Sequence, residues 1–132
     1  MPNNRQILYN KAYEPFSGFQ TIETIDCSDI EDGYLFMLDI LIHTSNGQNI
    51  LEICSFVHFQ SVYQKVGGVL TALGRRELKK VISDLTYATI QFIDGVDYQE
   101  VITGTDIDIQ VNGTYGTFSY ITSYVELDCV KA

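Results

Sequence analysis

Two Asn-Gly dipeptides, each set between two apolar segments, restrict what this chain can fold into more than any other feature. Asn46-Gly47 separates residues 34–43 from residues 49–57. Asn-Gly is the strongest short-range hairpin signal, because both residues accept the positive φ angles of a two-residue turn. This turn gives the hairpin one wholly apolar face, whose pairs are Ile42 with Leu51, Ile40 with Ile53 and Phe36 with Val57.

The second dipeptide, Asn112-Gly113, follows a segment in which apolar and polar residues alternate. Residues 105–111 show this alternation, and residues 114–120 continue after the turn. A two-residue turn places Ile107 opposite Phe118 on one face, whereas aspartates pair with hydroxyl residues on the other face. We therefore predict a second hairpin at this position.

Between the two predicted hairpins, residues 58–86 are expected to be helical. Four apolar residues follow the i, i+3, i+4, i+7 spacing of one helix face, namely Leu78, Val81, Ile82 and Leu85. We expect this face to pack on the sheet, and Gly67-Gly68 to interrupt the first half of the helix. Further strands are predicted at 19–26, 88–93 and 125–130.

Together these elements predict a single α+β domain, a mostly antiparallel sheet with a helical segment inserted at about 58–86. The length of 132 residues fits one domain, and residues 1–18 form a polar lead-in. A chain of this length buries about two-thirds of its unfolded surface on folding. No disulfide or metal ion is therefore required to hold the fold.

The distribution of charge favours a basic protein partner. The chain has 17 acidic and 8 basic side chains, a formal net charge of −9, which repels nucleic-acid phosphates and anionic membranes. No basic residue lies between Lys11 and Lys65 or between Lys80 and Lys131. Acids in loop segments are the best placed to bind a cationic protein, and these candidates are Asp26, Asp29, Glu31, Asp32, Asp94 and Asp97. In the alternative interpretation the acids only maintain solubility, or the basic helix neutralises them.

No catalytic, cofactor or metal site is predicted. The cysteines Cys27, Cys54 and Cys129 form no C-x-x-C pair, and unpaired thiols are typical of a reducing compartment. His43 and His58 lack metal-ligand spacing, and neither G-x-S-x-G nor a phosphate-binding glycine loop is present. With no signal peptide or membrane-spanning run either, we expect a cytoplasmic protein without enzymatic activity.

The sequence also resembles the immunity proteins of bacterial polymorphic-toxin and contact-dependent growth inhibition systems. The resembling stretches are Asp32-Gly33-Tyr34-Leu35-Phe36, the Asn46-Gly47 hairpin with Leu51-Glu52-Ile53, and residues 111–118. The resemblance implies a small, cytosolic, non-enzymatic protein that binds and neutralises a toxin domain. Two other interpretations stay open: a small α+β enzyme or ligand-binding domain that uses carboxylates, and a phage-type inhibitor that mimics nucleic-acid charge. The sequence leaves the oligomeric state open.

Overall fold

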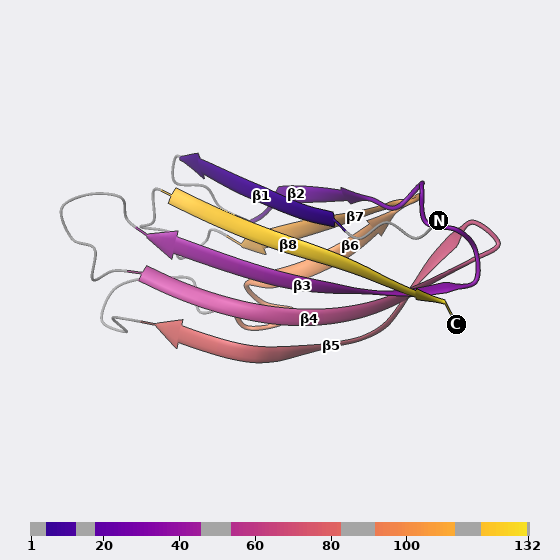
Figure 1. Ribbon diagram of the computed structural model, residues 1–132. Helices are drawn as coiled ribbons and strands as arrows, with labels where there is room; N and C mark the ends of the chain where they lie inside the picture. The colour runs from indigo at the N-terminus through magenta and orange to yellow at the C-terminus, as the bar shows by residue number, and fades with distance from the viewer. Residues whose placement is uncertain (1–4, 13–17, 46–53, 83–91, 113–119, 132) are drawn as a thin grey trace.

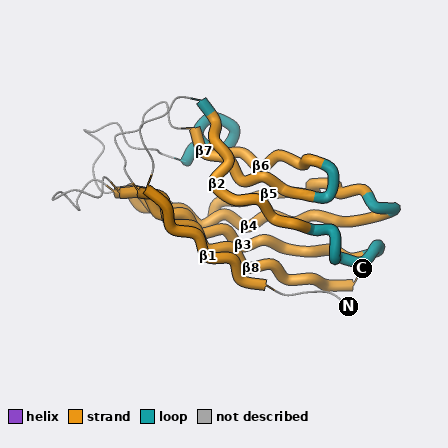
Figure 2. Tube along the Cα trace, turned by 90° about the horizontal axis from the view of Figure 1, so that it is seen from above, coloured by secondary structure: helices purple, strands orange, loops and turns teal. Residues whose placement is uncertain are grey.

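A computed structural model describes residues 5–12, 18–45, 54–82, 92–112 and 120–131 of the chain. These residues form eight strands, and the described part contains no helix (Figure 2). The strands are β1 (Arg5–Ala12), β2 (Phe19–Asp26), β3 (Tyr34–Ser45), β4 (Cys54–Val66), β5 (Val69–Ile82), β6 (Tyr98–Thr103), β7 (Asp106–Asn112) and β8 (Tyr120–Lys131). The described residues contain no helix that could cross a membrane.

The strands form two antiparallel sheets that lie face to face. The larger sheet has the order β1-β8-β3-β4-β5, and the smaller sheet has the order β2-β7-β6. Figure 1 shows the smaller sheet on one face of the larger sheet, and the turned view of Figure 2 shows the two as separate layers. The architecture is therefore a β-sandwich, in which each sheet buries one face against the other.

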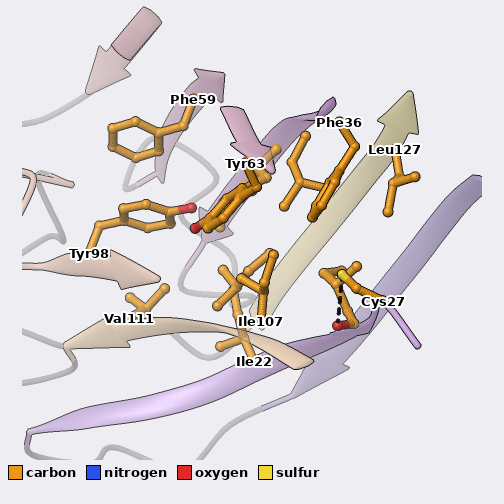
Figure 3. Close-up of a cluster of buried hydrophobic side chains, with 14 of the residues drawn as sticks. Ile22, Cys27, Phe36, Phe59, Tyr63, Tyr98, Ile107, Val111 and Leu127 are labelled. Atoms are coloured by element: carbon orange, nitrogen blue, oxygen red, sulfur yellow. Dashed lines mark hydrogen bonds between the residues drawn. The ribbon is translucent and has the colours of Figure 1, made fainter. Parts of the chain in front are cut away.

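Alternation along the strands places the core between the two sheets. Successive side chains of a strand point to opposite faces, so every second residue is buried. The buried residues are Phe36, Leu38, Ile40 and Ile42 of β3, Val57, Phe59 and Tyr63 of β4, and Ile107, Ile109 and Val111 of β7. Several of these side chains interlock with Ile22 of β2 and Leu127 of β8 (Figure 3).

The predicted α+β class is wrong, because the residues assigned to the inserted helix form β4 and β5. Leu78 is 42% exposed and Val81 is 49% exposed, so they do not form a face packed on the sheet. The side chain of Ile82 and all of Leu85 lie outside the described residues. Gly67-Gly68 is no helix break but the tight turn between β4 and β5, and both residues have the positive φ angles of 60° and 77° that this turn requires.

The first predicted hairpin is only partly right: β3 contains its first arm, β4 shares only residues 54–57 with the predicted second arm, and the register is wrong. Ile42 lies opposite Val57 rather than Leu51, and Phe36 lies opposite Tyr63 rather than Val57. Each partner is six residues further along the chain, and Asn46-Gly47 lies outside the described residues. Because six is an even number, the shift leaves the same side chains on the buried face, and alternation alone does not separate the two registers.

The second predicted hairpin is wrong, because β7 is the central strand of the smaller sheet. Ile107 lies opposite Ile25 of β2 on one side and opposite Ile102 of β6 on the other. Over residues 106–111, β2 and β6 therefore occupy both edges of β7. Phe118 lies outside the described residues, and Tyr120 begins β8 in the other sheet.

Of the three remaining predicted strands, two are confirmed, and the third lies mostly outside the described residues. The strand predicted at 19–26 is β2, and the strand predicted at 125–130 lies within β8. Of the strand predicted at 88–93, residues 88–91 are outside the described part, and Phe92 and Ile93 are not in a strand.

Candidate functional site

A buried carboxylate joins the two sheets at the side where β4 and β5 meet β6. The side chain of Glu100, on β6, is 0% exposed. It accepts hydrogen bonds from the Tyr63 hydroxyl at 2.5 Å and the Tyr98 hydroxyl at 2.5 Å. The Ser61 hydroxyl donates a third bond at 2.7 Å. Figure 3 shows the Tyr63 and Tyr98 hydroxyls pointing toward one another from opposite sheets.

The alternation of β4 explains how its polar residues reach this carboxylate. Val57 and Phe59 are followed on the same inner face by three buried polar residues, Ser61, Tyr63 and Lys65. We call these three residues the polar seam. Tyr98 is held in place by stacking of its ring on Phe59, with ring centroids 4.1 Å apart. The inner face of β4 is therefore apolar at one end and hydrogen-bonding at the other.

Arg75 of β5 links Glu100 to a second carboxylate. Its Nε and Nη2 donate to the two carboxylate oxygens of Asp94 at 3.1 and 2.6 Å, and its Nη1 lies 3.3 Å from Glu100 Oε1. The guanidinium also lies over the ring of Tyr98, 5.4 Å from the centroid, in a cation–π contact. Such two-pronged pairing fixes the planar guanidinium in one orientation. We call this group the edge latch. Its members are Glu100, Arg75, Asp94, Tyr98 and the two seam residues bound to Glu100, Ser61 and Tyr63.

The contacts within the edge latch raise the pKa values of two tyrosines and an arginine. Burial raises the pKa of Tyr63 and of Tyr98 above the ordinary tyrosine value, and the charge of Glu100 and the hydrogen bond to it raise both further. Burial alone would lower the pKa of Arg75, but the hydrogen bond to Asp94 and the charge of Glu100 outweigh it and raise this pKa. Both tyrosines thus stay neutral donors, and the guanidinium stays charged.

An open hollow of about 310 Å³ lies beside the latch. It is lined by Tyr63, Ala72, Leu73, Gly74, Arg75, Asp94 and Glu100. Two carboxylates in one hollow are a common arrangement for acid–base chemistry. Here, however, Glu100 is buried under three hydroxyl donors, and both oxygens of Asp94 are bound to Arg75. Both carboxylates are therefore engaged in hydrogen bonds that hold the two sheets together.

On the outer face of the larger sheet, a second hollow of about 210 Å³ lies over Gly74. Its walls are Gln60, Val62, Arg75 and Arg76. A row of polar contacts runs along one side: Arg76 Nε donates to Gln60 Oε1 at 3.3 Å, Gln60 Nε2 donates to Asp39 Oδ1 at 3.4 Å, and His58 Nε2 lies 2.9 Å from that same oxygen. This hollow exists because glycine contributes no side chain at that position.

The six acids predicted to bind a partner lie at two ends of the smaller sheet. Asp26 and Asp106 are paired at one end of the β2–β7 ladder, and Phe19 and Asn112 are paired at the other. Four of the six are exposed residues at the end of β2 and in the turn that follows it: Asp26, Asp29, Glu31 and Asp32. Asp94 and Asp97 lie beyond the opposite end, where the Asn112 N–H donates to the Asp97 carbonyl at 2.8 Å. The fold therefore does not unite the six in one patch.

Several of these acids already have roles within the fold. Asp97 is 1% exposed, so a partner does not reach its side chain, and Asp94 is bound to Arg75. The buried Lys65 inserts its Nζ beneath the acidic turn and donates to the carbonyls of Cys27 at 3.0 Å and Ser28 at 3.2 Å. Although no base is near this turn in the sequence, the fold brings one to it.

No cluster of three or more potential metal ligands occurs within the described ranges. The actual register brings the two histidines closer than the predicted hairpin would, since His58 lies opposite Leu41 and His43 opposite Phe56. His58 nevertheless contacts only one of the potential ligands among these residues, Asp39.

The edge latch was not predicted from the sequence. Its members come from β4, β5, β6 and the turn before β6, and no local spacing relates them. The one available signal was Glu100 itself, an acid within a segment of strand-forming residues.

No family model and no curated protein matches the sequence. Among solved structures, the chain is similar to the tailspike protein of Acinetobacter baumannii phage AM24, with a TM-score of 0.52 and 12% identity over 98% of this chain. It is also similar to the tailspike of Acinetobacter baumannii bacteriophage Fri1, a capsular polysaccharide depolymerase (TM-score 0.44, 9% identity, 95% of this chain), and to that of Acinetobacter phage vB_ApiP_P1 (TM-score 0.43, 10% identity, 98% of this chain).

The chain spans only 26%, 17% and 22% of those three tailspike chains. At these identities the similarity shows a shared fold and nothing beyond it. The AM24 match is a tailspike rather than an immunity or toxin–antitoxin protein, so this comparison lends no support to that resemblance. They also lend no support to the expectation that the chain lacks enzymatic activity.

Proposed function

We propose that this chain is a non-enzymatic β-sandwich module that binds another protein along the edge of β5 with which no described strand pairs. The observation that carries the proposal is the exposure of large apolar side chains on this one strand. Val69 is 62% exposed and Leu73 is 50% exposed, and Leu78 and Val81 extend the row. Single exposed apolar residues are ordinary, but a row of them on one element is typical of an interaction surface.

The position of β5 in the sheet supports this proposal. β5 has 14 residues, and among the described strands it pairs only with β4 and forms the end of the larger sheet (Figure 1). An edge strand offers backbone N–H and C=O groups to an added strand, which is a recurring mode of protein recognition. Similarity in fold to about a quarter of the AM24 tailspike is consistent with one module of a larger assembly.

An enzyme is the second candidate, and the hollow beside the edge latch is what favours it. The hollow contains two carboxylates and a guanidinium, and the Fri1 tailspike is described as a depolymerase. We place it second because general acid–base catalysis needs a carboxyl group within reach of the substrate. Glu100 is fully buried, and Asp94 is occupied by Arg75.

The net charge of −9 still predicts a basic partner, at a surface distinct from β5. Four predicted acids remain exposed in the turn after Asp26, and these would contact such a partner first. Reversing the charge of Asp29, Glu31 and Asp32 together should slow that association and reduce its salt dependence.

A selection of random displayed peptides of about ten residues tests the proposed β5 edge. We expect the enriched peptides to bind the double variant Leu73→Ser/Leu78→Ser at least about fivefold more weakly than the original chain, because apolar contact area is lost. Ile102→Ser is the matched control, since Ile102 is also an exposed apolar residue but lies on β6. If the selected peptides bind Leu73→Ser/Leu78→Ser as tightly as they bind Ile102→Ser, the proposal is contradicted.

A further inference from the structure

We infer that the partner bound at β5 is an extended acidic segment, with a large apolar side chain inserted over Gly74 and a carboxylate placed on Arg76. This inference rests on the proposed function and specifies the chemistry of its partner. Three observations carry it: two basic residues that have no ion-pair partner among the described residues, the hollow over Gly74, and the spacing between the two.

The bases of β5 that lack an ion pair within the described part of the chain indicate the charge of the partner. Five of the eight Lys and Arg residues lie within 65–80. Three of them are used internally: Lys65 by two backbone carbonyls, Arg75 by Asp94 and Glu100, and Lys80 by Glu77 at 2.8 Å. The other two, Arg76 and Lys79, are exposed and have no ion pair among the described residues.

These two bases share the outer face of the larger sheet. Arg76 lies opposite Gln60 and Lys79 lies opposite His58, both of which are on the outer face of β4. Glu77, the one acid of β5, lies opposite the inward-facing Phe59 and is bound to Lys80. In a chain of net charge −9, the outer edge of β5 therefore presents two cations that a negative strand would neutralise.

Gly74 supplies the second element of recognition. Its φ angle is not in the left-handed region, and a Cβ added there would meet nothing within 4 Å, so the backbone does not require glycine. Glycine within a strand weakens the strand and often marks a place where a ligand or another chain approaches closely. The hollow of about 210 Å³ over Gly74 is smaller than typical small-molecule sites of about 300–1,000 Å³. It suits one large side chain of an added strand, as aromatic residues cover edge glycines in sheets.

The spacing of Gly74 and Arg76 gives the partner a pattern. Both residues lie on the outer face, two positions apart, in the regular stretch between the irregular positions Leu73 and Leu78. An added strand places alternate side chains on that face. A partner with an aromatic residue and an acid separated by one residue therefore fills the hollow and reaches the guanidinium together.

A second copy of this chain is a poorer occupant of the edge. Antiparallel pairing of two β5 edges centred between Glu77 and Leu78 would place Arg76 of each copy opposite Lys79 of the other, and like charges across strands are destabilising. The register irregularities at Leu73 and Leu78 also interrupt a long continuous ladder. A short acidic segment avoids both penalties.

The test uses a fluorescent synthetic peptide of about ten residues that alternates Thr and Glu and has one central Phe. Fluorescence anisotropy measures its affinity for the chain. We expect Arg76→Gln/Lys79→Gln to weaken binding at least about tenfold, and raising salt from about 0.05 M to about 0.5 M to weaken binding to the original chain. The matched control is Phe19→Glu/Ile102→Glu, which changes the net charge by the same amount at two exposed residues of the smaller sheet and should change affinity less than about twofold.

A second variant separates binding from stability. Gly74→Val should fill the hollow and abolish the preference for the Phe peptide over its Ala version. Its melting temperature should stay the same or rise by about 2–4 °C, because valine suits a strand better than glycine. A loss of Phe preference in a folded variant supports the inference, whereas a retained preference overturns it.

The outcomes distinguish the two proposals. Equal binding of a peptide with Lys in place of Glu, or no effect of Arg76→Gln/Lys79→Gln, overturns the inference. A dimer in sedimentation that is lost in Leu73→Ser/Leu78→Ser also overturns it, since a second copy is then the occupant. If selected peptides bind at Leu73 and Leu78 while the acidic peptide does not bind, the proposed function stands and the inference fails. If no peptide binds at β5, both fail.

Discussion

At the scale of single residues, Glu100 is the point at which the two sheets are joined by polar contacts. Two tyrosine hydroxyls and a serine hydroxyl donate to it, and the guanidinium of Arg75 lies beside it. A carboxylate removed from water is tolerated only when such donors replace its hydration. Removing it would leave the three hydroxyl donors without this acceptor.

Glu100→Gln should therefore lower the free energy of unfolding by about 3–5 kcal/mol, the range found when one partner of a buried charge network is removed. Urea denaturation followed by circular dichroism measures this loss. Glu77→Gln is the matched control, because Glu77 is a partly exposed ion-pair partner at the surface and should cost no more than about 0.5 kcal/mol. Losses of equal size would show that the latch contributes little.

The raised pKa values of Tyr63 and Tyr98 predict a loss of stability at alkaline pH. Below about pH 10 both tyrosines are neutral in the folded and the unfolded chain, so they give no pH dependence. Above about pH 10 the unfolded chain releases two protons that the folded chain retains, and stability falls as pH rises. Unfolding free energies measured between about pH 8 and 11 should show this fall, and Tyr63→Phe/Tyr98→Phe should flatten it. An unchanged slope in that variant would contradict the assignment.

At the scale of elements, β5 shows how an edge strand can imitate a helix in sequence. Residues 75–80, Arg-Arg-Glu-Leu-Lys-Lys, are good helix formers, and the apolar residues around them fit a helical period. Cross-strand pairing with β4 overrides this local preference. The register shifts at Leu73 and Leu78 break strict alternation, so the strand period is not visible in the sequence.

A pair of leucine substitutions distinguishes the strand from the predicted helix. Leu38→Ala removes a fully buried side chain and should cost about 2–5 kcal/mol. Leu78→Ala removes a side chain that is exposed on β5, and should cost less than about 1 kcal/mol. Thermal and urea unfolding of the two variants measure the difference. A large loss at Leu78 would favour the packed helical face instead.

Features that depend on residues close together in the sequence were predictable, whereas features that depend on distant residues were not. The strand at Phe19–Asp26 was predictable from its composition, and so was a hairpin between residues 34–43 and the segment that follows them, because apolar residues alternate in both. The extent of β4 was not predictable, since residues 58–66 were assigned to the helix. The register was not, since an even shift preserves the buried face. Gly67-Gly68 was visible as a glycine pair, but a hairpin interpretation required knowing that its flanks were strands.

The candidate site was out of reach for a different reason. Its groups come from separate strands, and only the stacking of two sheets brings Tyr63 to Tyr98. The acidic turn shows the same limit, because Lys65 is far from Cys27 in sequence and reaches its carbonyl in space. Charge along the chain predicted which segments are acidic, but not which acids the fold uses internally.

At the scale of the whole molecule, the sandwich is held by two kinds of contact in different regions. Apolar side chains fill the space around Phe36 and Ile107, whereas the polar seam of β4 reaches across to Glu100 and to the turn after β2. Lys65 forms the last bonds of the seam, and its stem lies in the buried interior. The seam fixes how the β2–β3 turn is attached to the β4–β5 hairpin.

Lys65→Met should detach that turn while retaining the apolar stem. Since the ammonium donates to two backbone carbonyls, its loss should reduce the free energy of unfolding by about 1–3 kcal/mol. Urea unfolding measures this effect, and hydrogen exchange at residues 27–33 should speed up. Lys79→Met is the control, since Lys79 is exposed and its replacement should change stability by no more than about 0.5 kcal/mol. Unchanged exchange at the turn would show that Lys65 does not hold it.

The place of β8 between β1 and β3 governs the order in which the larger sheet can be completed during synthesis. At about 5–20 residues per second, the ribosome needs on the order of 4–15 seconds to make the chain between the end of β3 and the start of β8. During that interval β1 lacks β8, its one partner among the described strands, and the side of β3 that pairs with β8 is open. Pairings between distant segments also form slowly. The nascent chain therefore depends on β8 to close the sheet, and a chaperone that shields β3 until then would raise the yield of folded protein.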